Sequence, residues 1–325
     1  MATSWPKTFQ ETVYGGVEVL CSRISKLTGG RFTITPTPAG EIVPDLEVLD
    51  AVQQRKVECG HTAGYYYIDK NPALAFSSAM PFGLNTKQQN AWLLAGDGLE
   101  LTRKVYADFN VLNFPAGSTG NQMGGWFKQE VKSLSDLKGL KMRLTGLGGE
   151  VIKRLGAEDV QNLPAADILP ALERGDINAA EWIGPYDDEK LGLNKSASFY
   201  YYPGWQEPGM TFDLLVNRSA WEQLPKGYQV AIQAAASEAY ATIISRYDSL
   251  NPGALQRLVS SGTKLVPFTK DILAAAQKAA FEIYEEKAST DATFKEVYTQ
   301  WKGFREQIYE WHRVDELSFA DFVFA

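Results

Sequence analysis

Cysteine and histidine are scarce in this sequence, which contains only two residues of each type among 325. Cys21 and Cys59 lie in apolar stretches and form no CxxC pair, so buried free thiols are favoured over a disulfide. His61 and His312 are too few for a histidine-rich zinc site, and they make a Ser-His-Asp triad difficult to assemble. We therefore expect His61 to be a packed or hydrogen-bonded residue near a strand.

The sequence also lacks a long hydrophobic run and an excess of basic residues. No window is apolar over the length that a bilayer requires, so no membrane-spanning segment is predicted. The formal net charge is −7 and the pI about 5.1, which argues against nucleic-acid binding. The opening MATSWPKTFQ has no charged n-region or apolar h-region, which fits a mature terminus after a start codon or an untargeted cytosolic protein.

The apolar content suffices for a large core, and 325 residues favour two lobes over one domain. Val13, Val17, Leu20, Ile24 and Leu27 are spaced by four and three residues, which predicts a helix that ends at the following TGG. The next segment, RFTITPTP, alternates as a strand does. This start predicts an α/β fold.

Strands and helices continue to alternate along the chain. Asp45 is expected to cap a second helix, and KVECGHTAGYYY to form the next strand, so the βαβ order predicts parallel pairing. After residue 110, strands are predicted in NVLNFPAG, GGWF, LKMRL, VQNL, INAAEWI and TFDLLVN. Helices are predicted at about 149–155, in AADILPALERG with Pro170 in its first turn, and in a long alanine-rich segment from KGYQVAIQ.

The C-terminal region carries an aromatic seam on a predicted helix. Its members recur at alternating steps of three and four residues: Phe294, Val297, Trp301, Phe304, Ile308 and Trp311. Such a seam is too apolar to face water. It packs either on the lobes of its own chain or on a second copy of the chain, and both alternatives stay open.

Several polar residues stand at strand ends, where α/β proteins bind ligands. Arg143 ends LKMRL before a glycine-rich turn, where its guanidinium could bind a carboxylate or form an interlobe salt bridge. Glu181 and Trp182 end another apolar strand, and Glu207 repeats this pairing of acid and aromatic in WQEPG. Gln122, in GSTGNQMGGWF, suits a crossing between lobes or a flexible turn.

Motifs along nearly the whole chain occur in an order that resembles one family. They are PAG…VPDLEVLDAV, GNQMGGWF, DLKGLKMR, LPAADILPALERGDINAAEW, GPYDDEKLGL, YYYPGWQEPG and LLVNRSAWEQLP. This order resembles the substrate-binding proteins of tripartite ATP-independent periplasmic (TRAP) transporters. It is most similar to the branch that binds 2-oxo acids and related monocarboxylates together with a metal ion.

The resemblance implies a two-lobed α/β fold of the periplasmic binding protein type, with crossing strands and a long connecting helix. It places lobe I at 1–123 and 213–262, lobe II at 124–212, and a C-terminal helical segment available for dimerisation at 263–325. It also implies TRAP membrane subunits as partners. Because family members carry a cleaved export signal, we expect a mature periplasmic protein.

The resemblance also implies the site. Arg143 would pair with the ligand carboxylate, and a Na⁺ or Ca²⁺ ion touching the ligand would be held by Gln122, Glu181, the Trp182 carbonyl and Glu207. The candidate ligand-binding residues are Arg143, Gln122, Asn121, Tyr67, Trp182 and Glu181. All proposed metal ligands are oxygens, which disfavours zinc. The acids at 187–189 are interpreted as the solvated start of a helix.

Charge balance bears on the choice of cation. Two glutamates and a monocarboxylate carry three negative charges, which Arg143 and Ca²⁺ would neutralise, whereas Na⁺ would leave one negative charge.

The function that the resemblance implies is uptake of a small 2-oxo or 2-hydroxy acid such as pyruvate or lactate, without catalysis. The alternative is an enzyme in which Glu181 and Glu207 form an acid/base pair acting on a sugar or hydroxy acid. A bound cation would quench that pair.

Overall fold

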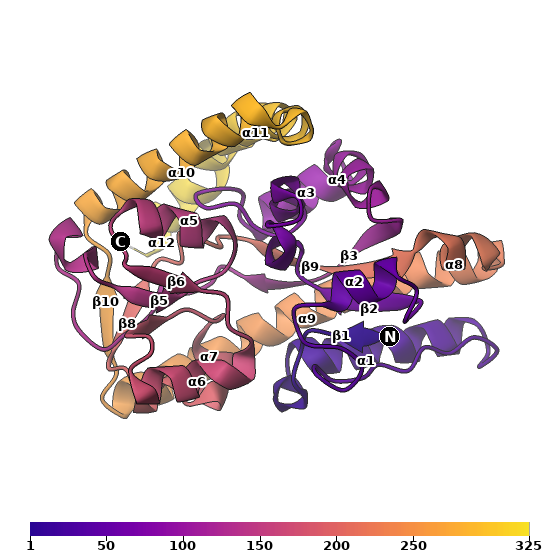
Figure 1. Cartoon of the computed structure of the whole chain (residues 1–325), viewed down its shortest axis with the longest axis horizontal. Coiled ribbons are helices and arrows are strands. Elements are labelled where there is room, and N and C mark those ends of the chain that lie inside the picture. Colours follow the sequence, from indigo (N-terminus) through magenta and orange to yellow (C-terminus); the bar gives the residue numbers. More distant parts are fainter. Residues whose placement is uncertain (325) are drawn as a thin grey trace.

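A computed structural model describes residues 1–324 and contains two lobes, each built on its own sheet (Figure 1). Lobe I has the four-stranded order β1-β2-β9-β3, formed by Ala2–Thr3, Cys59–Thr62, Met210–Asn217 and Val111–Gly120. Lobe II has the six-stranded order β10-β8-β4-β7-β5-β6, formed by Lys264–Pro267, Phe199–Tyr202, Gly125–Phe127, Ala179–Ala180, Lys141–Arg143 and Asp159–Gln161. The predicted two-lobed α/β class is confirmed.

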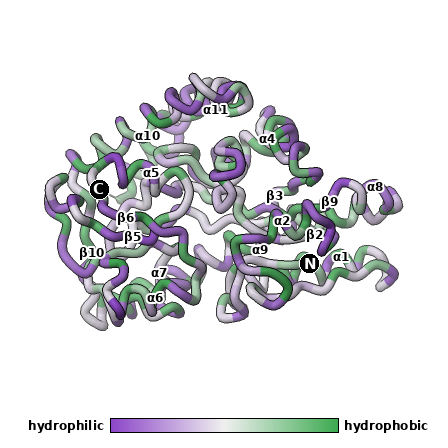
Figure 2. The backbone as a smooth tube through the Cα atoms, in the orientation of Figure 1, coloured by the Kyte–Doolittle hydropathy of each residue, from purple (hydrophilic) through white to green (hydrophobic). Residues whose placement is uncertain are grey.

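Helices cover both sheets. In chain order they are α1 Val13–Leu27, α2 Val48–Gln53, α3 Thr86–Leu94, α4 Gly98–Ala107, α5 Gly146–Arg154, α6 Ala165–Arg174, α7 Pro185–Leu191, α8 Arg218–Gln223, α9 Lys226–Ser260, α10 Lys270–Thr290, α11 Ala292–His312 and α12 Ser318–Val323. Figure 2 shows green and purple alternating around α4, as expected for a helix with one face packed on the core. None of the described helices has both the length and the apolar character needed to cross a bilayer.

The chain passes between the lobes through 121–124, which joins β3 to β4, and through 203–209, which joins β8 to β9. The long α9 packs on α1 and β3 in lobe I and on α7 in lobe II (Figure 1). Because β9 returns from lobe II, it runs antiparallel to β2 and β3. The prediction of parallel pairing was therefore right for β1–β2 and β5–β6 and wrong for the crossing strands.

Several local predictions were wrong. Asp45 does not cap the second helix, because the residue before α2 is Glu47 and no side-chain capping hydrogen bond forms there. RFTITPTP forms no strand and contributes only an isolated bridge between Thr37 and Ala2, because Pro36 and Pro38 lack the N–H groups that a ladder needs. Pro170 lies inside α6 instead of in its first turn. The burial of Ile168 and other apolar residues on that helix holds it in place despite the missing hydrogen bond.

The scarce residues behave as expected. Cys21 and Cys59 are buried free thiols. His61 lies in β2, where its Nδ1 atom accepts a hydrogen bond of 2.7 Å from Trp5 Nε1, and burial lowers its pKa to about 4. The segment 263–325 begins with β10, which pairs in parallel with β8, so it supplies a strand to lobe II before its helices begin.

The aromatic seam on α11 divides between core and surface. Phe294, Val297 and Trp301 are buried, and Trp301 packs on Phe76 at a ring distance of 5.7 Å. At the other end of the helix, Trp311 is 60% exposed. The first half of the seam therefore packs on its own chain, which is one of the two alternatives open from the sequence.

This division predicts opposite outcomes for two tryptophans of one helix. Trp301→Ala should lower the free energy of unfolding by about 3–5 kcal/mol, because it leaves a cavity in a packed aromatic cluster. Trp311→Ala, the matched control, should change the free energy of unfolding by less than about 0.5 kcal/mol at protein concentrations low enough to keep the chain monomeric. Urea unfolding of both variants measures the difference, and equal losses would show that the seam is not divided in this way.

Candidate functional site

The candidate site lies where the two crossing segments meet the ends of β5 and β7. The Gln122 N–H donates to the Glu207 carbonyl at 3.3 Å, which joins the crossing segments to each other. The Glu181 N–H donates to the Arg143 carbonyl at 3.1 Å, which joins the two strand ends. Backbone hydrogen bonds thus bring together four residues that lie far apart in the sequence.

Arg143 is the centre of this cluster and is only 1% exposed. Its Nη1 atom donates to Glu181 Oε2 at 3.0 Å and to the Glu181 carbonyl at 2.5 Å, and its Nε atom donates to the Leu163 carbonyl at 3.2 Å. Its guanidinium carbon lies 5.0 Å from the centre of the Trp182 ring. The ion pair therefore lies within lobe II and is not an interlobe bridge, and the guanidinium is held in one orientation.

Two buried carboxylates share the space beside this guanidinium. Burial and the nearby Glu207 raise the pKa of Glu181 well above its ordinary value, and Arg143 opposes the rise. Burial likewise raises the pKa of Glu207 to about 7, although Arg143, Tyr65 and Thr145 favour its charged form. One guanidinium does not neutralise two carboxylates, so the cluster carries excess negative charge when both are ionised.

Several buried oxygens here have no hydrogen-bond donor. They are Gln122 Oε1, Glu181 Oε1, Gln206 Oε1 and Glu207 Oε2. Buried polar atoms are normally satisfied, and a cation is the partner that would satisfy oxygens alone. The residues therefore fit Na⁺ or Ca²⁺. Among residues 1–324 no group of three or more His, Cys, Asp or Glu side chains is placed to hold a metal, which is unlike a zinc site.

The other predicted site residues lie in different places. Trp182 is buried, and its ring packs near the Arg143 guanidinium and lies 5.5 Å from the Phe9 ring, measured between ring centres. Tyr67 is not part of the cluster, because its hydroxyl bonds Thr62 Oγ1 at 2.8 Å and accepts from the Leu49 N–H at 3.2 Å.

Asn121 is exposed and lines a surface groove of about 640 Å³ beside the C-terminal helices. In contrast, Tyr65 and Gln206 belong to the cluster and were missed from the sequence. Gln206 precedes Glu207 in the WQEPG loop, and Tyr65 is the second residue of the GYYY turn that contains Tyr67, so the signal for each was its position near a chosen residue.

The acids after the Glu-Trp pair are a correction to the sequence interpretation. Asp187 and Asp188 are buried and not solvated, with exposures of 0% and 1%. Asp188 accepts from Trp126 Nε1 at 2.9 Å, from the Tyr200 hydroxyl at 2.8 Å, and from the backbone N–H of Ile183 at 3.1 Å. These partners lie in lobe II, so Asp188 anchors the segment that follows Trp182.

Two α/β lobes joined by crossing segments, with a buried arginine and donor-free oxygens between them, define a bilobed solute-binding protein. The family model described as "Bacterial extracellular solute-binding protein, family 7" (DctP) matches residues 1–291. The chain belongs to this family, that of the TRAP solute-binding proteins. It is 61% identical over 323 residues to a monocarboxylate 2-oxoacid-binding periplasmic protein of Nostoc sp., covering 99% of this chain and 88% of that one.

Solved structures agree closely with this fold. A TRAP solute-binding protein of Bordetella bronchiseptica is 45% identical with a TM-score of 0.98, covering 100% of this chain and 96% of that one, and is a mixed-occupancy dimer with calcium and picolinate in one site. A Colwellia psychrerythraea protein with calcium and pyruvate is 34% identical (TM-score 0.94), and a Pseudoalteromonas atlantica protein with sodium and pyruvate is 33% identical (TM-score 0.95). In both comparisons 98% of this chain and 97% of the other are covered.

The raised pKa values predict how stability depends on pH. The pKa of Glu207 is about 7 in the folded protein and 4.5 ordinarily, so the folded state binds the proton of this carboxyl more tightly than the unfolded state does. The stability that this proton contributes is complete below pH 4.5 and is lost as pH rises through 7. In chelator-treated protein, the free energy of unfolding should therefore fall between about pH 5 and 8. Added Ca²⁺ should restore more stability at pH 8 than at pH 5.

Urea unfolding across this pH range provides the measurement. Glu207→Gln is the control, because a glutamine cannot ionise and the fall between pH 5 and 8 should become smaller. A wild-type profile as flat as that of Glu207→Gln would contradict the assignment of the pH dependence to this carboxylate.

Proposed function

We propose that this chain is the extracytoplasmic solute-binding protein of a TRAP transporter and binds a small 2-oxo or 2-hydroxy monocarboxylate, such as pyruvate or lactate, together with Na⁺ or Ca²⁺. The observation that carries this proposal is the juxtaposition of the Arg143 guanidinium with donor-free oxygens of Gln122, Glu181 and Glu207. A cation and an organic anion are together the partners that such a site lacks. The named relatives support the ligand class.

Each residue has a role that follows from its contacts. Arg143 binds the ligand carboxylate, and Leu163 and Glu181 fix its orientation through Nε and Nη1. These hydrogen bonds use Nε and Nη1, so we assign Nη2 to the ligand carboxylate. The oxygens of Gln122, Glu181 and Glu207, with the Trp182 carbonyl, would hold the cation, which supplies positive charge to the anion.

The same features disfavour the alternative of an enzyme with a glutamate acid/base pair. A carboxylate that coordinates a cation cannot also exchange protons freely, and Glu181 already forms an ion pair with Arg143. The family is one of extracellular solute-binding proteins, and the Nostoc relative is periplasmic. We therefore propose a periplasmic location, membrane subunits of a TRAP transporter as partners, and no catalytic activity.

Calorimetric titration tests this function. In protein freed of metal and ligand, pyruvate should bind only weakly, and added Ca²⁺ or Na⁺ should restore tight binding, because the cation supplies part of the anion site. A panel of 2-oxo and 2-hydroxy acids, dicarboxylates and sugars defines the class. Sugars that bind while every 2-oxo and 2-hydroxy acid fails would refute the proposal.

Two variants separate the roles within the site. Arg143→Lys should weaken binding by about 1.5–3 kcal/mol, or roughly ten- to a hundredfold, at any cation concentration, because an ammonium cannot keep the contacts to Leu163 and Glu181 and also donate to the ligand carboxylate. Glu181→Gln should weaken cation binding first and recover partly when excess metal is supplied. An Arg143→Lys protein that binds like wild type would remove this residue from the carboxylate site.

We also propose a homodimer formed through the C-terminal end of the chain. The large apolar side chains there are at least half exposed: Trp311, Val314, Leu317, Phe319, Phe322, Val323 and Phe324. Exposed apolar side chains that gather at one end of a chain are typical of a protein interface. The Bordetella relative is a dimer, which supports a second copy of this chain as the occupant.

Analytical ultracentrifugation of charge variants tests the dimer. Phe319→Asp combined with Phe322→Asp should give a monomer that still binds pyruvate, because both side chains are exposed. Val230→Asp, a change at a side chain that is 62% exposed on α9, is the matched control and should stay dimeric. Wild-type protein that sediments as a monomer at high concentration would exclude the dimer.

A further inference from the structure

The segment before α1 reaches from lobe I to the candidate site in lobe II. It contains the short helix η1 (Lys7–Phe9) and ends at Thr12, the residue that precedes α1. Two of its side chains, Phe9 and Thr12, are fully buried. Phe9 contacts Trp182 and Thr12 contacts Asp187, two residues of the segment 182–187 that follows β7.

Phe9 packs on Trp182 in a stacked arrangement. The ring centres are 5.5 Å apart and the planes differ by 21°. The Arg143 guanidinium lies 5.0 Å from the centre of the same indole ring. A residue of lobe I thus supports the tryptophan that packs on the proposed carboxylate-binding arginine, which ties the approach of the lobes to the position of Arg143.

Thr12 makes the second contact. Its hydroxyl donates to Asp187 Oδ1 at 2.8 Å and also lies 3.4 Å from the Phe9 carbonyl oxygen. The other oxygen of this carboxylate accepts a hydrogen bond of 2.7 Å from the Tyr247 hydroxyl of α9. A threonine at this position usually caps its own helix, but Thr12 makes no such bond to α1. Its hydroxyl is used between lobes instead.

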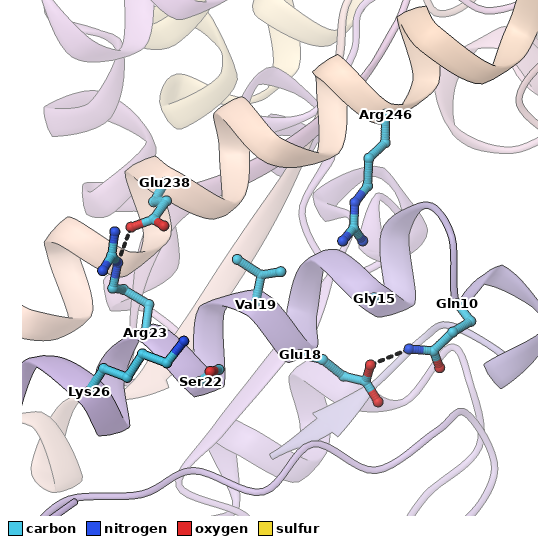
Figure 3. Close-up of a pocket in the computed structure, with 9 residues that line it drawn as sticks. All are labelled: Gln10, Gly15, Glu18, Val19, Ser22, Arg23, Lys26, Glu238 and Arg246. Carbon is cyan, nitrogen blue, oxygen red and sulfur yellow. Dashed lines mark hydrogen bonds and ion pairs between the residues drawn. The ribbon is translucent and has the colours of Figure 1, made fainter.

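The contact between α1 and α9 makes Thr12 a fixed point of lobe I. A Cβ atom on Gly16 would lie 2.1 Å from Ile243 Cγ1, and one on Gly15 would lie 2.7 Å from Arg246 Nη1, so the two helices touch through glycines. Figure 3 shows Arg246 of α9 directed towards Gly15 at the start of α1. With α1 held against α9 in this way, movement of Asp187 away from Thr12 requires lobe II to move.

We propose that Phe9 and Thr12 form a latch that fastens lobe II against lobe I and thereby sets how long a ligand stays bound. Neither residue contributes a ligand atom to the cation or the carboxylate in this arrangement. They are positioning residues that act through Trp182 and Asp187. The proposal rests on the proposed function for its ligand, but the latch also governs the opening of the lobes in ligand-free protein.

Stopped-flow kinetics with pyruvate and Ca²⁺ test the latch. Thr12→Val keeps the shape of the side chain and removes the hydroxyl, so the dissociation rate should rise about tenfold, as expected for a lost hydrogen bond to a buried carboxylate. The association rate should change by less than about twofold, because the open state is unaffected. Thr12→Ser restores a hydroxyl and should return the dissociation rate towards that of wild type.

The matched control is Thr28→Val at the other end of α1. The Thr28 hydroxyl is also buried, and it donates to the Ile24 carbonyl at 2.9 Å within lobe I. This change removes a buried hydroxyl of the same kind without touching lobe II, so its dissociation rate should match wild type. Equal rates for Thr12→Val and Thr28→Val would overturn the latch, whereas failure of wild type to bind any organic acid would overturn the proposed function.

Interlobe distances decide the question without a ligand. Spin labels at Lys26→Cys in α1 and Lys153→Cys in α5 report the separation of the lobes, and the buried Cys21 and Cys59 are protected from labelling. In ligand-free protein, Thr12→Val should shift the population to longer distances, and Phe9→Leu should do the same. Distance distributions identical to wild type in both variants would refute the latch even if pyruvate proved to be the wrong ligand.

Discussion

The burial of Glu181 and Glu207 beside a single guanidinium is the constraint on which this molecule depends. Arg143 neutralises one carboxylate at most, and burial raises the pKa of both. Oxygen atoms without donors surround the second charge. Such an arrangement costs stability in the absence of a counter-charge. Under the proposed function, binding of an anion together with a cation would remove that cost.

Both lobes contribute residues to this cluster. Its residues come from crossing segments and from strand ends of lobe II, and lobe I adds Tyr65 and the Phe9 ring from outside. The cluster is therefore complete only when the lobes meet. The next two acids also connect this region to both lobes. Asp187 accepts a hydrogen bond from Thr12 of lobe I, and Asp188 accepts one from the backbone after Trp182 within lobe II.

The C-terminal helices are divided between core and surface. The first half of α11 supplies Phe294 and Trp301 to the core of its own chain, which explains why the aromatic seam begins there. Beyond Trp311 the apolar side chains turn outward and continue along α12. A helix that is core at one end and exposed at the other is suited to joining two copies without disturbing either fold.

The sequence alone determined the α/β class, the order of most strands, the long α9, and the positions of Arg143, Gln122, Glu181 and Glu207 at strand ends or crossings, because these depend on local periodicity and on motif order. It did not determine what a residue meets across the chain. Asp187 was interpreted as solvated because three acids in a row look exposed, yet its partner Thr12 is 175 residues away. Tyr67 was preferred over Tyr65 although both stand in one GYYY turn, and only the fold decides which hydroxyl faces Glu207. Long-range pairing, which local pattern does not encode, decided burial, partner and charge state at each of these positions.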